Sequence, residues 1–170
     1  MCPSIGSETG YADTFNAPIG GWDVSRVTDM NWMFDGATAF NADIGAWDVS
    51  AVPNLQSAFA NAKTFNQDIG AWDVNQPIGA WDVSSVADMK AMFRNATAFN
   101  QPLGDWDVSK VTDMSDMFND ATIFNQEIGG WDADTARVDD AFLNSGLRKC
   151  PSWADDKNAQ GPCKADPAAR

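Results

Sequence analysis

The sequence predicts an α/β solenoid, a short right-handed coil resembling leucine-rich repeats and built from about five repeats of 25 residues. Trp22, Trp47 and Trp72 follow one another at intervals of 25 residues, and Trp106 and Trp131 resume that interval. The phenylalanines that precede these tryptophans recur at the same intervals. Inside every unit the spacing of apolar residues changes from every second position to every third or fourth position. A fixed period of this length is typical of stacked repeats that bury a shared core.

The repeat units divide the chain into three regions. Units begin at Phe15, Phe40, Phe65, Phe99 and Phe124. We expect an N-terminal cap over 1–14, the repeats over 15–147 and a cysteine-containing C-terminal cap or tail over 148–170. A nine-residue insert at 75–83 nearly repeats the preceding segment 66–74, and we expect it to loop out or distort one coil.

Each unit is expected to combine a strand-like arm, a short helical or 3₁₀ arm and a glycine-containing turn. In Trp106-Asp107-Val108 the apolar residues alternate, as they do in a strand. After Ser109 apolar residues recur every three or four positions, which favours a helix. Ser109 and its counterparts Ser25, Ser50 and Ser84 are the expected N-caps. The alternative fold is an all-strand β-helix, which should show alternation throughout.

Large side chains at equivalent positions are expected to form ladders through the stack. The aromatic ladder residues are Trp22, Trp47, Trp72, Trp106, Trp131, Phe40, Phe65, Phe99 and Phe124. An asparagine follows the first phenylalanine of each unit, and its amide is expected to pair with backbone groups at a turn; this ladder comprises Asn41, Asn66, Asn100 and Asn125. Trp32 and Trp153 lie outside these ladders and are candidates for exposure.

A file of acidic residues follows the tryptophans and allows two interpretations. It comprises Asp23, Asp48, Asp73, Asp107 and Asp132. The recurring Asp-Val-Ser sequence favours turns in which the carboxylate accepts a bond from the serine two residues later. Stacked carboxylates could also bind a hard cation, so calcium is the alternative cofactor; otherwise we expect none.

Composition excludes several function classes. The chain has 170 residues, a net charge of −13 and no histidine. The charge argues against nucleic-acid binding, and the lack of histidine removes His-based acid–base and nucleophile systems. Every repeated acid has a copy in the next unit, whereas a glycosidase needs one particular pair of carboxyls. We therefore expect no enzyme, with a glycan-acting enzyme as the third hypothesis, and no membrane span.

The cysteines and one sequon bear on location. Cys150 and Cys163 are candidates for a disulfide that ties down the C-terminal tail, while Cys2 is left for a partner or stays reduced. Asn95 begins an N-glycosylation sequon. No signal peptide is visible in this chain, yet the cysteine pair favours an oxidising compartment, outside the cell or on its surface. The alternative is three reduced cysteines in a cytoplasm.

The segments 65–74, F-N-Q-D-I-G-A-W-D-V, and 106–121, W-D-V-S-K-V-T-D-M-S-D-M-F-N-D-A, resemble the BspA-like bacterial surface-protein repeat, also called domain of unknown function 285. The resemblance covers about residues 15–147. It implies an architecture like that of leucine-rich repeats and an adhesive or structural role, and it brings no catalytic residues.

These observations together predict a non-enzymatic recognition or scaffold module. It would bind a protein or glycan partner, associate with itself or pack into a larger assembly. Calcium-dependent surface binding through the acidic file is the second hypothesis.

Overall fold

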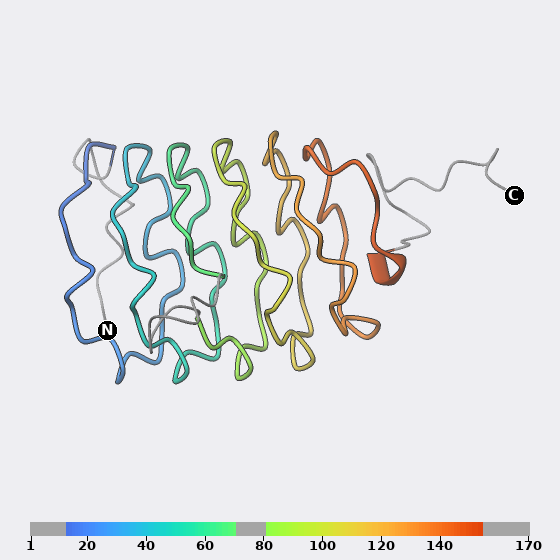
Figure 1. Ribbon diagram of the computed structural model, residues 1–170, viewed down its shortest axis with the longest axis horizontal. Helices are drawn as coiled ribbons and strands as arrows, with labels where there is room; N and C mark the ends of the chain where they lie inside the picture. The colour runs from blue at the N-terminus through green and yellow to red at the C-terminus, as the bar shows by residue number, and fades with distance from the viewer. Residues whose placement is uncertain (1–12, 71–80, 155–170) are drawn as a thin grey trace, which may run out of the picture.

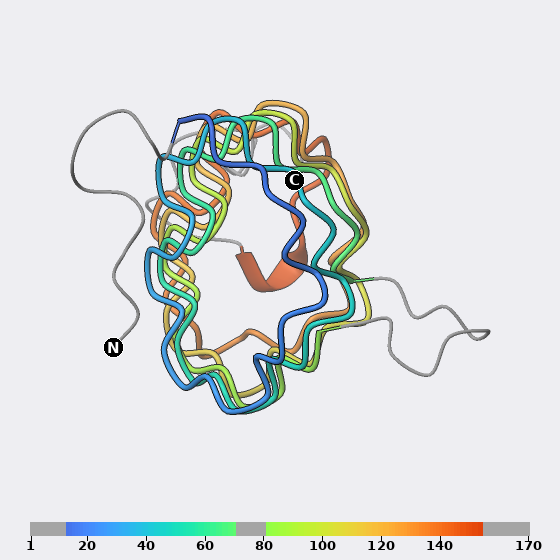
Figure 2. The ribbon, with the colours of Figure 1, turned by 90° about the vertical axis from the view of Figure 1, so that its left-hand side faces the viewer.

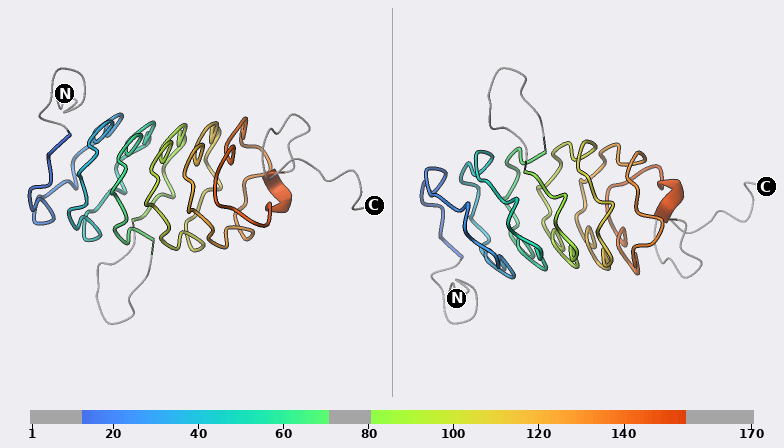
Figure 3. Two further views of the ribbon diagram at one scale, coloured as in Figure 1. Left: turned by 90° about the horizontal axis from the view of Figure 1, so that it is seen from above. Right: turned by 90° about the horizontal axis from the view of Figure 1, so that it is seen from below.

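The computed structural model describes residues 13–70 and 81–154. The chain runs as successive coils that stand side by side along one axis (Figure 1). Seen from above and below, the coils keep the same slant from one end of the row to the other (Figure 3). Viewed along the row, their backbones superimpose around one oval outline (Figure 2). Equivalent residues of successive units therefore lie next to one another.

Backbone bonds within the coils alternate with bonds between them. In the first unit, every second N–H group donates to a carbonyl of the next unit at 2.9–3.0 Å; the donors are Trp32, Phe34 and Gly36. The N–H groups between them donate to the carbonyl three residues earlier, as in β-turns; these donors are Met33, Asp35 and Ala37. The arm is thus a series of turns, and its N–H groups are satisfied without a helix or sheet.

The expected helical arm is replaced by these turns. Two residues in each unit, four positions apart, have positive φ, which an α-helix does not accept. The first of these two residues is Ala91 in the third described coil (φ 53°) and Asp116 in the fourth (φ 59°). The second falls on Asn61, Asn95 and Asn144, and asparagine is among the residues that tolerate this conformation best. Ser25, Ser50, Ser84 and Ser109 accordingly cap no helix.

Regular secondary structure is sparse in the described residues. The helix there is the 3₁₀ helix η1 (Ser152–Ala154), and parallel pairing consists of isolated bridges that link Asn54 to Asp88, Asp88 to Asp113 and Asp113 to Arg137. A turn precedes the Trp-Asp-Val segment in four coils. There the tryptophan N–H donates to the isoleucine or leucine carbonyl three residues earlier, as it does at Trp22, Trp47, Trp106 and Trp131. Neither the expected strand arm nor an all-strand coil is formed.

Two files of phenylalanine fill the interior. The file from Phe15 to Phe124 has centroid separations of 5.7–6.1 Å between successive rings. A second file, which the sequence analysis did not single out, comprises Phe34, Phe59, Phe93, Phe118 and Phe142, with separations of 5.5–5.8 Å. Inside a coil the two files touch face to face, as in Phe93 and Phe99 at 4.1 Å. All ten phenylalanines of the chain belong to this stack.

The position of Trp81 corrects the limits of the insert. Trp81 is buried, its N–H donates to the Ile69 carbonyl and its indole Nε1 donates to the Ile44 carbonyl at 3.1 Å, as Trp47 does one coil earlier toward Ile19. Val83 is also in the core. Residues 81–83 thus belong to the coil and not to the insert, and the nine additional residues precede Trp81. Trp72 and Asp73 lie outside the described residues.

The C-terminal end of the row is covered by η1, which lies across the oval outline (Figure 2). Trp153 of this helix stacks on Trp131 with a centroid distance of 5.6 Å and donates from Nε1 to the Ile128 carbonyl at 3.0 Å. It therefore continues the tryptophan ladder and is only partly exposed, contrary to the expectation that it lies outside the ladder. An indole seated on the last ring removes that ring from water.

Candidate functional site

Most of the predicted ladder tryptophans are committed to the core. Trp47, Trp106 and Trp131 are buried, and each indole Nε1 donates to a backbone carbonyl of the preceding coil at 2.9–3.3 Å. Trp22 differs, because it lies in the first coil and is 55% exposed. The ladder thus gives each buried indole N–H a partner, and it leaves these rings no surface with which to bind a ligand.

The asparagine file joins each coil to the next through a side-chain amide. The Oδ1 atom of Asn41 accepts the backbone N–H of Asn66 at 2.9 Å, and the same bond recurs from Asn66 to Asn100 and from Asn100 to Asn125. At the end of the row, Asn125 Oδ1 accepts the N–H of Arg148. These amides therefore serve as backbone partners.

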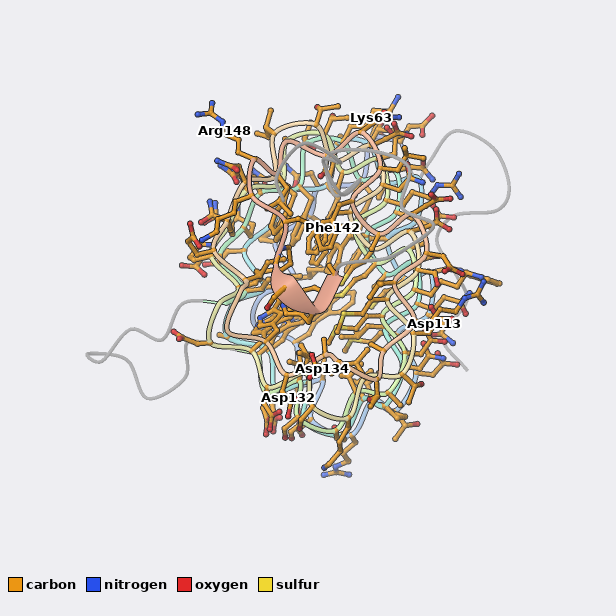
Figure 4. All side chains as sticks on the ribbon, turned by 90° about the vertical axis from the view of Figure 1, so that its right-hand side faces the viewer. Lys63, Asp113, Asp132, Asp134, Phe142 and Arg148 are labelled. Atoms are coloured by element: carbon orange, nitrogen blue, oxygen red, sulfur yellow. The ribbon has the colours of Figure 1, made fainter. Side chains whose placement is uncertain are left out.

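The acidic file makes turns of the expected kind. Asp23 Oδ1 accepts from both the N–H and the hydroxyl of Ser25, at 3.1 and 2.6 Å, and Asp48 makes the same pair of bonds with Ser50. Asp107 and Asp82 accept the N–H of the serine that follows each of them by two residues. In Figure 4, Asp132 lies with Asp134 at the edge of the outline farthest from Lys63.

The serine bonds lower the pKa of these carboxyl groups. The hydroxyl of Ser50 is the larger cause for Asp48 and its N–H is the second; the same order holds for Asp23 and Asp107 with their own serines. A folded-state pKa below that of the unfolded chain, about 3.9 for aspartate, stabilises the fold above that value. The contribution is lost as the pH falls through the folded pKa.

We expect Ser50→Ala to raise the pKa of Asp48 toward its ordinary value and to flatten the loss of stability below about pH 4. Carboxyl carbon shifts followed by NMR during an acid titration measure the pKa directly. Ser50→Thr, which keeps the hydroxyl, is the control and should leave it low. An Asp48 titration that Ser50→Ala does not move would contradict this cause.

No cation site is formed by the acidic file within 13–70 and 81–154. No group of three or more cysteine, aspartate or glutamate side chains there is placed to hold a metal ion. One oxygen of Asp23, Asp48, Asp82 and Asp107 is already engaged by the following serine. Calcium stays a prediction from sequence, and this geometry does not favour it.

We therefore expect the melting temperature to be the same in millimolar calcium and in excess chelator, because an ion that binds only the folded state would raise it. Thermal unfolding followed by tryptophan fluorescence tests this, with magnesium as the ionic-strength control. A rise specific to calcium would restore the cation hypothesis.

The predicted glycosylation site and one of the predicted disulfide cysteines contact other parts of the stack. Asn95 is partly buried, and its Nδ2 atom, which a glycan would modify, donates to Asn61 Oδ1 at 3.0 Å. Glycosylation there would break this bond. Cys150 packs partly buried against the core, while Cys163 and Cys2 lie outside the described residues, so their pairing stays a prediction.

A groove crosses the coils on the wall that carries the series of turns. It measures about 400 Å³ and is lined by Asp35, Ser57, Asn61, Arg94, Asn95 and Asp120, with Ala60 and Ala91 in addition. We call the exposed side chains of this wall the variable face. The residues equivalent to Trp32 are Ser57, Ala91, Asp116 and Asp140, and those equivalent to Asp35 include Ala60 and Arg94.

The sequence does not reveal this groove because most of the positions that line it change from coil to coil. Among the lining residues only Asn61 and Asn95 share a residue type at equivalent positions. Asn95 was predicted only as a glycosylation site. Trp32 was predicted to be exposed because it lies outside the ladders, and it is 51% exposed.

Stacked units, aromatic files and side-chain amide bonds between coils define this chain as a repeat protein. A family model described as Mycoplasma protein of unknown function, DUF285, matches residues 9–77 and again residues 73–147. The chain belongs to this family. No curated protein and no solved structure matches it. Within the described part of the chain, no helix is both long and apolar enough to cross a membrane.

Proposed function

We propose that this protein is a non-enzymatic recognition module, a short solenoid resembling leucine-rich repeats that is displayed outside the cell or on its surface. It would bind a protein or glycan partner or pack into a larger assembly. The proposal rests on the separation, within each coil, of the residues that hold the stack together from the residues that face solvent on the variable face. Repeated side chains maintain the stack, and the variable face presents different side chains from one coil to the next.

The repeated polar residues support this division because their bonds are internal. The asparagine file supplies acceptors to the next coil, and the acidic file closes turns with serine. A catalytic pair of carboxyls would need two acids that escape the repeat and face one another across a cleft. The groove residues Asp35 and Asp120 come from the first and the fourth described coils, so two coils separate them.

The stack also supports binding through its rigidity. The interior contains continuous aromatic files, and the bonds between coils fix the backbone of the variable face. A surface that is held in place before binding loses little conformational entropy on binding. This is the advantage that repeat scaffolds offer to recognition.

The proposal is tested by incubating fluorescently labelled protein with intact cells and with isolated envelope material, and measuring bound label against concentration. We expect saturable binding. A reducing-sugar assay on the same envelope material should show no release of sugar. Absence of saturable binding, or steady turnover of a glycan, would overturn the proposal.

A further inference from the structure

We infer that the groove on the variable face binds a neutral oligosaccharide, with Trp32 as the aromatic platform at its first coil. This inference rests on the proposed recognition function and names its ligand class. Four features carry it: the shape of the groove, the exposed indole, the fixed amides and the balance of charge.

The groove has the size and position of a small-ligand site. Its volume of about 400 Å³ lies within the range of about 300–1,000 Å³ that is usual for such sites. Its floor includes the small side chains Ser57, Ala60 and Ala91, which let a ligand approach the backbone. None of the residues that line the groove belongs to the acidic file. In Figure 4, Asp113, at the start of the turn series, lies on a different side of the outline from Asp132 and Asp134.

Trp32 occupies, in the first coil, the position that the groove residues Ser57 and Ala91 occupy in the next two coils. It shares positive φ and coil position with Ser57 and Ala91, so the three side chains leave the backbone in the same direction. The Trp32 N–H donates to Gln56, the neighbour of Ser57, at 3.0 Å. A half-exposed indole offers a flat apolar face with a polar edge, which suits the C–H face of a sugar ring and its hydroxyls.

The groove lining also includes two amides whose orientation is fixed by hydrogen bonds. Asn61 Nδ2 donates to Asp35 Oδ1 at 2.8 Å, and Asn95 Nδ2 donates to Asn61 Oδ1 at 3.0 Å. Each amide has two N–H groups and two lone pairs. In this ladder Asn61 uses one N–H and one lone pair, and Asn95 uses one N–H. The second N–H and the remaining lone pairs are suited to hydroxyl groups, which both donate and accept.

The charges of the groove favour a neutral ligand. Arg94 stands between the carboxylates of Asp35 and Asp120, so the groove contains both signs. The whole chain carries −13, which repels acidic glycans and phosphates. Sugar hydroxyls can accept from the guanidinium and donate to the carboxylates without bringing a further charge out of water.

An extended peptide is less suited to this wall. Peptides that add a strand use unpaired backbone groups at a sheet edge. Here the backbone N–H groups of the arm donate either to the next coil or within a turn, as they do at Ser57, Ala58 and Phe59. Recognition on this wall therefore depends on side chains.

The test compares two exposed tryptophans. Trp32→Ala introduces the residue that Ala91 already provides at the same position and φ, so the fold should tolerate it. Trp22→Ala removes the other indole that is exposed among the described residues, and Trp22 does not share the coil position of Trp32, Ser57 and Ala91. Arg94→Ala likewise copies Ala60. Circular dichroism and melting temperature establish that each variant is folded.

Binding is measured on an array of neutral and acidic oligosaccharides, followed by calorimetric titration of the neutral sugars that bind. We expect wild type and Trp22→Ala to bind the same neutral structures, and Trp32→Ala to lose about tenfold or more in affinity. Arg94→Ala should weaken binding to a smaller degree. Binding to no neutral sugar, or equal loss in Trp22→Ala and Trp32→Ala, would overturn the inference.

Treatment of the envelope material separates this inference from the proposed function. If periodate oxidation of sugar diols abolishes binding and protease does not, both stand. If protease abolishes binding and periodate does not, the recognition function stands and the oligosaccharide inference is overturned in favour of a protein partner. If untreated envelope material binds nothing, both fail.

Discussion

Phe93→Ala should lower the free energy of unfolding by about 3–5 kcal/mol, the largest loss expected from a single substitution in this chain. Phe93 is fully buried and its ring lies against four others: Phe59 at 5.8 Å, Phe99 at 4.1 Å, Phe118 at 5.5 Å and Trp106 at 6.4 Å. Truncation would leave a cavity between coils that are held by other bonds and cannot collapse. Both neighbouring coils would lose contacts.

Denaturant unfolding followed by tryptophan fluorescence measures this loss. Because repeat stacks need not unfold in one step, amide hydrogen exchange should be recorded as well, and it should show the greatest loss of protection in the coils next to Phe93. Phe15→Ala serves as the matched control: Phe15 is only partly buried, and among the described aromatic rings its own ring stacks on Phe40 alone, at 5.9 Å. Similar losses in the two variants would contradict the idea of a cooperative central stack.

The period, the asparagine file and the first phenylalanine file could be predicted from sequence because identical side chains fill identical surroundings. Asn66 and Asn100 recur for one reason, which is that each coil offers the same backbone N–H to the amide below it. The arm could not be predicted in the same way. A spacing of three or four residues is produced by a helix, but also by successive turns of the kind seen at Met92 and Arg94, whose N–H groups donate three residues back.

Two further features of the structure differ from the sequence prediction for reasons that the residue types do not reveal. Ala91 and Asp116 adopt positive φ without a glycine to announce it, because the bonds to adjacent coils hold the backbone there. The insert contains a second copy of the Trp-Asp-Val sequence, so either copy could enter the stack by pattern. The indole bond of Trp81 to Ile44 identifies the copy that does.

The role of the glycine that recurs before the tryptophan of each unit could not be predicted from sequence either, and replacing it should cause the second large loss of stability. In sequence it marks a turn, but none of the glycines Gly20, Gly45, Gly70 and Gly104 has positive φ. A Cβ built on Gly45 would lie 2.7 Å from the Asp68 carbonyl oxygen of the next coil, and one on Gly20 would lie 2.5 Å from that of Asp43. Glycine is needed here for the close approach of two backbones.

Gly45→Ala should therefore destabilise the protein by about 1–3 kcal/mol, since a backbone carbonyl must move to admit the methyl group. Gly129→Ala is the matched control, because a Cβ there meets nothing within 4 Å. That variant should be neutral or slightly stabilising, as the methyl group restricts only the unfolded chain. The denaturant midpoints of the two variants test this prediction. Equal midpoints would mean that the coils can separate at Gly45 without loss of stability. Close contact between coils would then no longer explain why glycine returns in every unit.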